Sequence, residues 1–233
     1  SVPSARAIVG DAPLADETVA RYAVMVYSAR GGPCTGVVLA QDLVLTAAHC
    51  VFATAKITIV GPVAGRLFRL ADVVQTISHP RYDLYALLAK DRAADLALLK
   101  LANPLRNTFG RAFLSPRPIP PRARLVIVGY GMSTVGDRAT SGTARMTMLI
   151  VNSQSGDVLL LSEPVSFGGT RQLGGCGGDS GAPAFAMTGG VPVLVGIVWG
   201  GDRCGGTTVV TPLWPYRDWL LETANQLGSP LTP

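Results

Sequence analysis

The sequence is poor in charged residues and in long apolar runs, and each shortage excludes a class of protein. Only 15% of its 233 residues are charged and 48% are hydrophobic, which argues against a disordered chain and supplies a folded core. No apolar run reaches the roughly 20 residues of a membrane helix; Pro192 and Gly196 interrupt even the run from Val191 to Trp199. The arginines behind the net charge of +5 are scattered along the chain. We therefore predict neither a nucleic-acid nor a membrane partner.

Cysteine and histidine are also scarce. No two of the four cysteines have the CxxC spacing, so a structural zinc site and a thioredoxin-like motif are poorly supported. An even number of widely spaced cysteines favours two disulfides, with three pairings open, and an oxidising compartment. We therefore predict a secreted protein, extracellular or periplasmic.

Short apolar runs punctuated by Gly, Pro or Asp indicate strands. They lie at 22–27, 36–40, 43–46, 56–60, 67–70, 73–77, 96–101, 125–129, 147–151, 158–161, 182–186, 193–198 and 207–210. No helical stretch separates them, which argues against a parallel sheet with crossover helices and for an antiparallel all-β fold.

One helix is expected at the end of the chain. Residues 213–228 carry an apolar stripe of Leu213, Trp214, Trp219, Leu220 and Leu221, and Gly228 and Pro230 stop the helix. Five prolines between 104 and 124 mark a linker between two sub-domains. Two antiparallel β-barrels with a cleft between them would fit this pattern. The predicted divisions are a leader at 1–7, barrels at 8–103 and 125–212, the linker at 104–124 and the helix at 213–228.

Residues 174–183, GGCGGDSGAP, surround one Asp-Ser pair with glycine, which is costly unless the backbone must come close to a ligand. His49 lies in LVLTAAHC and Asp95 opens the apolar run AADLALLKL, whereas the other histidine, His79, precedes a proline that marks a turn. Serine, histidine and aspartate together suit nucleophilic catalysis. An α/β-hydrolase would need its histidine after the serine, and a subtilisin-like order using Asp42 disagrees with the many strands.

The segments TAAHC, DLALLKL and CGGDSGAP, in this order, resemble the chymotrypsin-like (trypsin-type) serine proteases. The resemblance implies that His49 is the general base and acid, Asp95 its orienting carboxylate and Ser180 the nucleophile. It implies two six-stranded antiparallel β-barrels with the active site in the cleft between them, and an oxyanion hole formed by the N–H groups of Gly178 and Ser180. It also implies disulfides between Cys34 and Cys50 and between Cys176 and Cys204.

The resemblance further implies an activation step. In the family, a new N-terminus beginning Ile-Val-Gly folds inward, and its ammonium pairs with the aspartate before the serine, here Asp179. Ile8 is preceded by seven residues, and cleavage after Ala7 would expose it. The hypothesis is a zymogen-like form of low activity while residues 1–7 are attached. The alternative is a family member that orders its pocket without the inserted terminus.

By resemblance, the floor of the specificity pocket is Gly174, and its walls come from Val198, Trp199, Gly200 and Thr208. Position 174 has no carboxylate that could pair with a Lys or Arg side chain of the substrate, and Thr208 would narrow the pocket. Both features favour small or medium apolar P1 residues. Val198 stands where the family usually has a serine that supports the catalytic aspartate. Either Asp95 finds another donor or activity is reduced.

These observations predict a secreted, monomeric serine endopeptidase that works through an acyl-enzyme. Its partners are a peptide or protein substrate and, as a further candidate, a protein inhibitor. We predict no cofactor. We also predict no metal, because the segment from Arg69 to Gln75, roughly where some members of the resembled family hold calcium, contains only one acid, Asp72. The alternatives are a protease-fold binding protein with weak or no catalysis, and a regulated protease that acts on a single partner protein.

Overall fold

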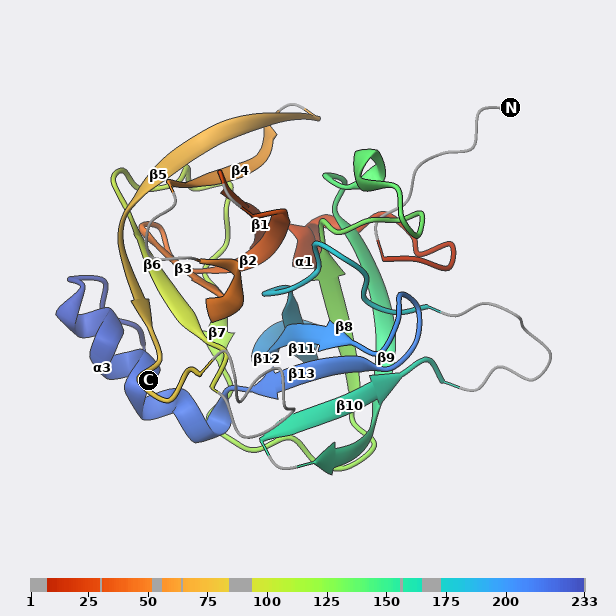
Figure 1. Ribbon diagram of the computed structural model, residues 1–233. Coiled ribbons are helices and arrows are strands. Elements are labelled where there is room, and N and C mark those ends of the chain that lie inside the picture. Colours follow the sequence, from red (N-terminus) through yellow and green to blue (C-terminus); the bar gives the residue numbers. More distant parts are fainter. Residues whose placement is uncertain are drawn as a thin grey trace.

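The computed structural model describes residues 8–29, 31–51, 56–63, 65–83, 94–155, 157–164 and 173–232. The predicted leader, residues 1–7, lies outside the described residues. Two β-barrels follow one another along the chain and lie side by side, with the first barrel in red to yellow and the second in green to blue (Figure 1). This is the predicted all-β architecture.

The first barrel is closed by six antiparallel strands in the order β1-β2-β3-β6-β5-β4. Apolar side chains at alternate positions of strands such as β4 point into its core, as a half-buried strand requires. Its strands are β1 (Ala23–Ser28), β2 (Pro33–Ala40), β3 (Leu43–Thr46), β4 (Ile57–Val63), β5 (Arg66–Ser78) and β6 (Ala97–Leu101).

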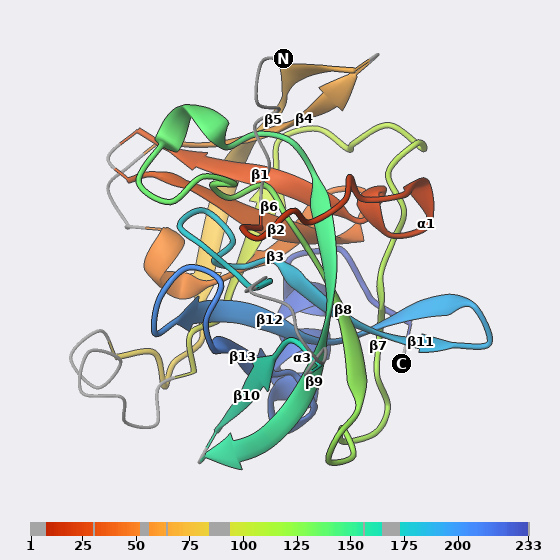
Figure 2. The ribbon, with the colours of Figure 1, turned by 90° about the vertical axis from the view of Figure 1, so that its right-hand side faces the viewer.

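The second barrel is a sheet in the order β11-β8-β9-β10-β13-β12, closed by pairing between β11 and β12. It lies below the first barrel when the molecule is turned by 90° (Figure 2). Its strands are β8 (Arg124–Gly129), β9 (Arg145–Ser155), β10 (Val158–Ser162), β11 (Pro183–Thr188), β12 (Val191–Gly201) and β13 (Thr208–Pro212). Within the predicted linker, β7 (Phe113–Leu114) adds a parallel pair to β12.

Three local expectations differ from the structure. The runs 67–70 and 73–77 belong to one strand, β5, which bends at a register shift opposite β4 between Ile59 and Val60. A short helix, α1 (Glu17–Ala20), lies where no helix was expected, and the Asp16 side chain caps it by accepting the Thr18 N–H. The short turns η1 (Ala48–Cys50) and η2 (Arg138–Thr140) are 3₁₀-helical.

The C-terminal helix α3 spans Arg217–Gln226 and follows a separate 3₁₀ turn, η3 (Trp214–Tyr216), so it begins later than expected. Pro215 lies within this turn, where its missing N–H costs nothing. Trp214 is 45% exposed and therefore does not belong to the apolar stripe, whereas Leu220 is fully buried. Among the helices of the described residues, none is long and apolar enough to cross a membrane.

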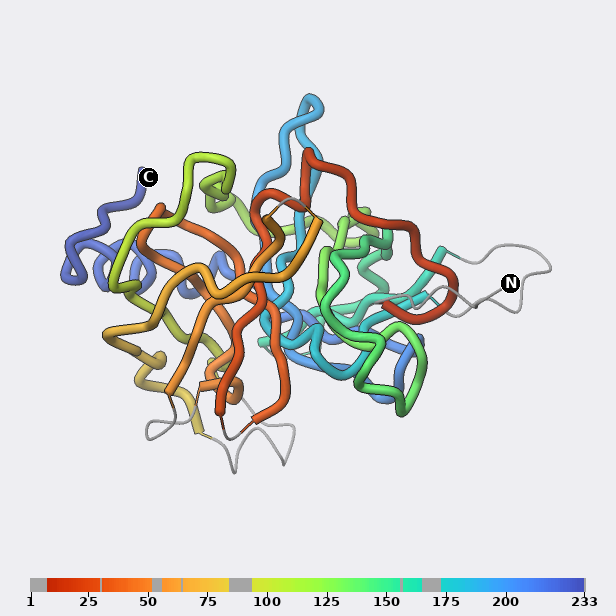
Figure 3. Tube along the Cα trace, turned by 90° about the horizontal axis from the view of Figure 1, so that it is seen from above, coloured from red at the N-terminus to blue at the C-terminus, as the bar shows by residue number. Residues whose placement is uncertain are grey.

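Helix α3 follows the second barrel in sequence but packs against the first, as the view from above makes clear (Figure 3). The buried His79 ring meets Tyr216 and Trp219 edge-on, with ring centroids 5.0 and 4.7 Å apart. Burial, with a contribution from Arg81, lowers the pKa of His79. The His79 ring therefore packs against the segment that contains Tyr216 and Trp219, and its lowered pKa favours the neutral imidazole.

A polar cluster fixes the end of the chain to the same barrel. Lys100 Nζ donates to Asp42 Oδ2 and to Ser229 Oγ, both at 2.6 Å, and Ser229 Oγ donates to Asp42 Oδ1 at 2.7 Å. Burial raises the pKa of Asp42, but the hydrogen bonds from Lys100 and Ser229 outweigh it and hold that pKa below the usual 3.8. The cluster joins β6, the turn after β2 and the segment after α3.

Replacing Lys100 with methionine should lower the free energy of unfolding at neutral pH by about 1 to 3 kcal/mol, because Asp42 loses its cation. A carboxyl with a depressed pKa contributes its full stabilisation above its ordinary pKa and loses it as the pH falls through its lower folded pKa. The difference between the two proteins should therefore shrink as the pH is lowered below 3.8 in chemical denaturation. Lys56→Met is the control, since that amine is 68% exposed and 3.9 Å from Asp72. Equal effects of the two variants would contradict this interpretation.

Candidate active site

The predicted base His49 and the predicted carboxylate Asp95 are in direct contact. His49 lies on η1, shortly after β3, and Asp95 is separated by Leu96 from the start of β6, which pairs with β3. His49 Nδ1 is 2.6 Å from Asp95 Oδ2, and the backbone N–H of His49 donates to Asp95 Oδ1 at 2.9 Å. The Asp95 side chain is fully buried, whereas that of His49 is 26% exposed. The pair therefore leaves Nε2 as the ring nitrogen able to exchange a proton with a ligand.

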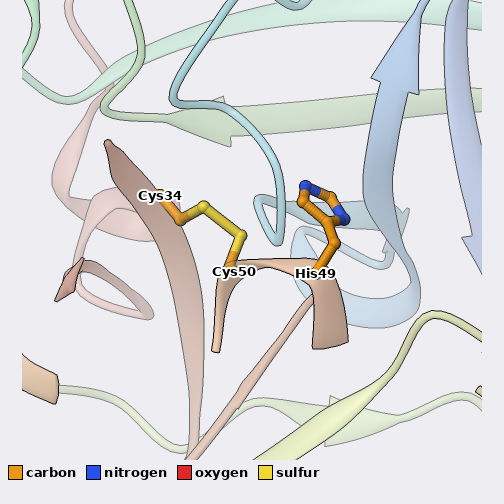
Figure 4. A group of neighbouring side chains, drawn as sticks. All are labelled: Cys34, His49 and Cys50. Atoms are coloured by element: carbon orange, nitrogen blue, oxygen red, sulfur yellow. A yellow bond between two sulfur atoms is a disulfide. The ribbon is translucent and has the colours of Figure 1, made fainter. Parts of the chain in front are cut away.

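The Cys34–Cys50 disulfide connects β2 to the turn that carries His49. Figure 4 draws the His49 ring beside the two bonded sulfurs. One ligand atom from each of Cys34, His49 and Cys50 lies within 4.8 Å of the others, which resembles a metal site by distance alone. Both sulfurs are consumed in the disulfide, so neither can be a thiolate ligand.

Ser180 lies at the start of the turn before β11, against the same disulfide. Cys50 Sγ is 3.9 Å from the Ser180 carbonyl oxygen. The Ser180 hydroxyl donates to the Trp199 carbonyl at 3.3 Å. In the described part of the chain, His49 forms no hydrogen bond with this hydroxyl. Hydrogen bonds between catalytic groups often form only when substrate is bound.

Gly178, predicted to form part of an oxyanion hole, has a backbone conformation that requires glycine. Gly178 has φ +100°, and a β-carbon there would lie 2.7 Å from the Gly131 Cα, so only glycine fits. In the described part of the chain, the N–H groups of Gly178 and Ser180 donate to no protein acceptor. Two free backbone donors beside a serine hydroxyl can stabilise an oxyanion.

Asp179 is fully buried between these two residues. Its Oδ1 accepts the Gly131 N–H at 2.8 Å and its Oδ2 accepts the Cys176 N–H at 2.9 Å. A β-carbon at position 131 would lie 2.6 Å from the Asp179 Cγ, so glycine makes room for the carboxylate. Burial raises the pKa of Asp179 to about 7, although both backbone hydrogen bonds oppose the shift.

The predicted activation residue Ile8 is also buried, at 0% exposure, in the core of the second barrel. The next residue, Val9, forms an isolated antiparallel bridge with Gly174. Segment 8–9 therefore pairs directly with the predicted floor of the specificity pocket.

The predicted pocket residues lie on two facing segments. A β-carbon at Gly174 would be 2.9 Å from the Gly206 carbonyl oxygen. The main chain therefore occupies the space that a carboxylate side chain at position 174 would need. Thr208 is buried and its Oγ1 accepts the Gly175 N–H at 3.0 Å, beside that floor. A β-carbon at Gly200 would meet nothing within 4 Å, so that wall is open. The Cys176–Cys204 disulfide, as expected, ties the two segments together.

Val198 lies in the core of the second barrel and is 1% exposed. It cannot donate to Asp95, and both oxygens of Asp95 instead accept from His49. His49 thus supplies the donors to the carboxylate through its ring and its main chain.

Two residues that contact segment 177–180, which carries the predicted oxyanion donors, were not identified from the sequence. Thr35 is fully buried and hydrogen-bonded to Gly178, and Met132 donates its N–H to the Gly177 carbonyl at 2.8 Å. A threonine in a strand is an ordinary residue, and its contacts lie 143 positions away, so no local signal reveals it.

Comparison with known proteins adds sequence evidence. A family model described as Trypsin matches residues 8–220. A trypsin of Phaedon cochleariae is 29% identical over 209 residues, 81% of this chain and 78% of that protein. An alpha-fibrinogenase-like protein of Daboia siamensis is 28% identical, covering 85% of this chain and 80% of its own. Vitamin K-dependent protein C of Mus musculus is 29% identical over 88% of this chain, which spans only 49% of that longer protein.

The full chain should lose stability as the pH rises from about 4 to about 7, because a carboxyl with a raised folded pKa favours folding only while protonated. The Asp179→Asn variant should lack this slope, which amounts to at most about 4 kcal/mol. Denaturation across this pH range measures both. Asp16→Asn, at an exposed helix cap, is the control and should keep the slope. The same slope in all three proteins would refute the assignment.

Proposed function

Because this chain belongs to the trypsin family of serine proteases, we propose that it is a serine endopeptidase that cleaves peptide bonds through an acyl-enzyme. The observation that carries the proposal is the contact of His49 Nδ1 with the buried Asp95 carboxylate, in a protein whose Ser180 adjoins two free backbone N–H groups. Together these groups provide a base, a nucleophile and an oxyanion site.

In the proposed reaction, Ser180 Oγ attacks the peptide carbonyl carbon while His49 Nε2 takes the hydroxyl proton. Asp95 holds the Nδ1–H tautomer and stabilises the imidazolium that forms. The carbonyl oxygen becomes an oxyanion bound by the N–H groups of Gly178 and Ser180. His49 then protonates the leaving amine and the C–N bond breaks. A water, deprotonated by His49, hydrolyses the ester and restores Ser180.

We propose a preference for small or medium apolar P1 residues. Support comes from the main chain of Gly205 and Gly206 beneath Gly174, and from Thr208 at the Gly175 N–H. A shallow pocket without a carboxylate at its floor has nothing to pair with a Lys or Arg side chain. Trp199 and Gly200, at the end of β12, would pair with the substrate backbone as an added strand.

We also propose that removal of residues 1–7 raises activity. Asp179 carries a desolvated carboxyl that titrates near neutrality, and the buried segment at Ile8 and Val9 already adjoins the pocket floor. An ammonium at Ile8 would pair with the Asp179 carboxylate, depress its pKa and secure the loop that carries Gly178.

We propose that the protein is secreted, which the two disulfides and the family membership support. We also propose that the enzyme is monomeric and that its partners are a protein substrate and a protein inhibitor.

A fluorophosphonate probe tests the proposed chemistry, because it reacts only with an activated serine. The chain that begins at Ile8 should gain the mass of one probe, and the full chain should label more slowly. Ser180→Ala should not label and should lower kcat by about 10⁶-fold with little change in KM.

Equal labelling of both forms would refute the role of the leader but keep the protease. Failure of both forms to label, in folded protein, would leave the binding-protein alternative as the better reading. Retention of most of the activity by Ser180→Ala would reject the assignment of the nucleophile.

Thr208→Gly should widen the specificity pocket. The ratio of kcat/KM for a Phe to an Ala peptide anilide should rise at least about tenfold, the scale on which a few methylene groups are discriminated. Thr207→Gly is the matched control, since it places the same change one residue earlier. If the two variants change the ratio equally, Thr208 does not set the P1 preference.

A further inference from the structure

We propose that Thr35 is a positioning residue that holds the oxyanion loop, residues 177–180, in its active geometry and sets that loop relative to His49. The inference rests on the proposed protease function. Thr35 lies on β2 of the first barrel, whereas the oxyanion loop belongs to the second barrel, so this residue bridges the two halves of the candidate site.

The Thr35 hydroxyl both donates and accepts a hydrogen bond inside the protein. It is 0% exposed. Its Oγ1 donates to the Gly178 carbonyl at 2.9 Å and accepts the Tyr130 N–H at 3.1 Å. A buried hydroxyl with both a donor and an acceptor partner has a single orientation, so it fixes the distance between the end of β8 and Gly178.

The Thr35 main chain makes a second link to the loop. Its N–H donates to the Ser180 carbonyl at 2.8 Å, and its own carbonyl accepts from Thr46 Oγ1 at 2.7 Å. The preceding residue, Cys34, is bonded to Cys50, the neighbour of His49. Cys34 is therefore linked by a covalent bond to the turn that carries His49. The next residue of β2, Thr35, is linked by hydrogen bonds to the loop that carries Ser180.

These bonds matter because a peptide group is planar, so a held carbonyl also directs the N–H of the same peptide. The Met132 N–H holds the Gly177 carbonyl, which aims the Gly178 N–H away from Met132. Gly178 itself, at φ +100°, has wide rotational freedom. The Thr35 hydroxyl holds the next carbonyl, that of Gly178, so it restrains the rotation at Gly178 that sets the Gly178 N–H relative to the following peptides and to the Ser180 N–H.

Four variants test the role. Thr35→Val is isosteric but has no hydroxyl, Thr35→Ala is smaller, and Thr35→Ser keeps the oxygen. Thr140→Val is the matched control, because the Thr140 hydroxyl also accepts backbone N–H groups, from Ser133 and Thr134 at 3.1 Å, and donates to the Asp137 carbonyl at 2.6 Å. It makes no contact with residues 177–180 among the hydrogen bonds of the described chain.

Steady-state kinetics on an Ala peptide anilide, in the full chain and in the chain from Ile8, should separate kcat from KM. Thr35→Val should lower kcat by about 10- to 100-fold and change KM by less than about threefold, because a misaimed donor fails mainly in the transition state. A peptide boronic acid, whose tetrahedral adduct places an oxygen in the oxyanion hole, should lose affinity by the same factor as kcat/KM. Thr35→Ser should retain kcat within about threefold.

Three results would overturn the proposal: equal loss of kcat in Thr140→Val, loss in Thr35→Ser as large as in Thr35→Val, or unchanged boronate affinity in Thr35→Val. If Thr35→Val does not fold, the comparison of Thr35→Ala with Thr35→Ser gives the same decision. Absence of turnover and probe labelling in the unmutated protein would instead count against the proposed function, so the two failures are distinguishable.

Discussion

The candidate site depends on the junction at Cys34 and Thr35, because its two reactive side chains come from different barrels. His49 and Asp95 belong to the first barrel and Ser180 to the second. The disulfide from Cys34 fixes the turn that carries His49, and the Thr35 N–H binds the Ser180 carbonyl. Helix α3 reinforces this arrangement from behind, since it follows the second barrel and packs on the first through the contact of Trp219 with His79, and the segment after it is held to the first barrel by the bond from Lys100 to Ser229. Small relative shifts of the barrels would separate the proposed base, His49, from the proposed nucleophile, Ser180.

A second constraint is the burial of Asp179, which explains much of the glycine around the site. Its carboxyl occupies space that a side chain at Gly131 would need, and it draws the N–H groups of Gly131 and Cys176 toward itself. The loop is therefore built around an acid that is expensive to ionise, with a pKa near 7. A charge that comes close to the Asp179 carboxyl would therefore change its ionisation and, with it, the geometry at Gly178. The proposed ammonium of Ile8 is one such charge.

The candidate catalytic residues could be predicted from the sequence more completely than the residues that hold them in position. The glycines of GGCGGDSGAP and the isolated acid Asp95 are costly residue choices, and costly choices indicate function; the disulfides followed from the family resemblance. Thr35 could not be found, because a buried threonine in a strand is unremarkable until its long-range partners are known. Trp214 was wrongly placed in the core because the helical period was applied across Pro215, where η3 rotates the chain away from α3. Strand β5 was divided in two because a bend interrupts its apolar pattern.

The most direct test of the account is to trap the covalent intermediate. An activated ester of an Ala-terminated peptide, mixed with the chain from Ile8 and quenched in acid within the first turnover, should leave one acyl group on the protein. Peptide mass analysis should locate it on Ser180, and it should disappear at the rate of turnover. Turnover that proceeds without any acyl group on Ser180, or with one on another residue, would contradict the account.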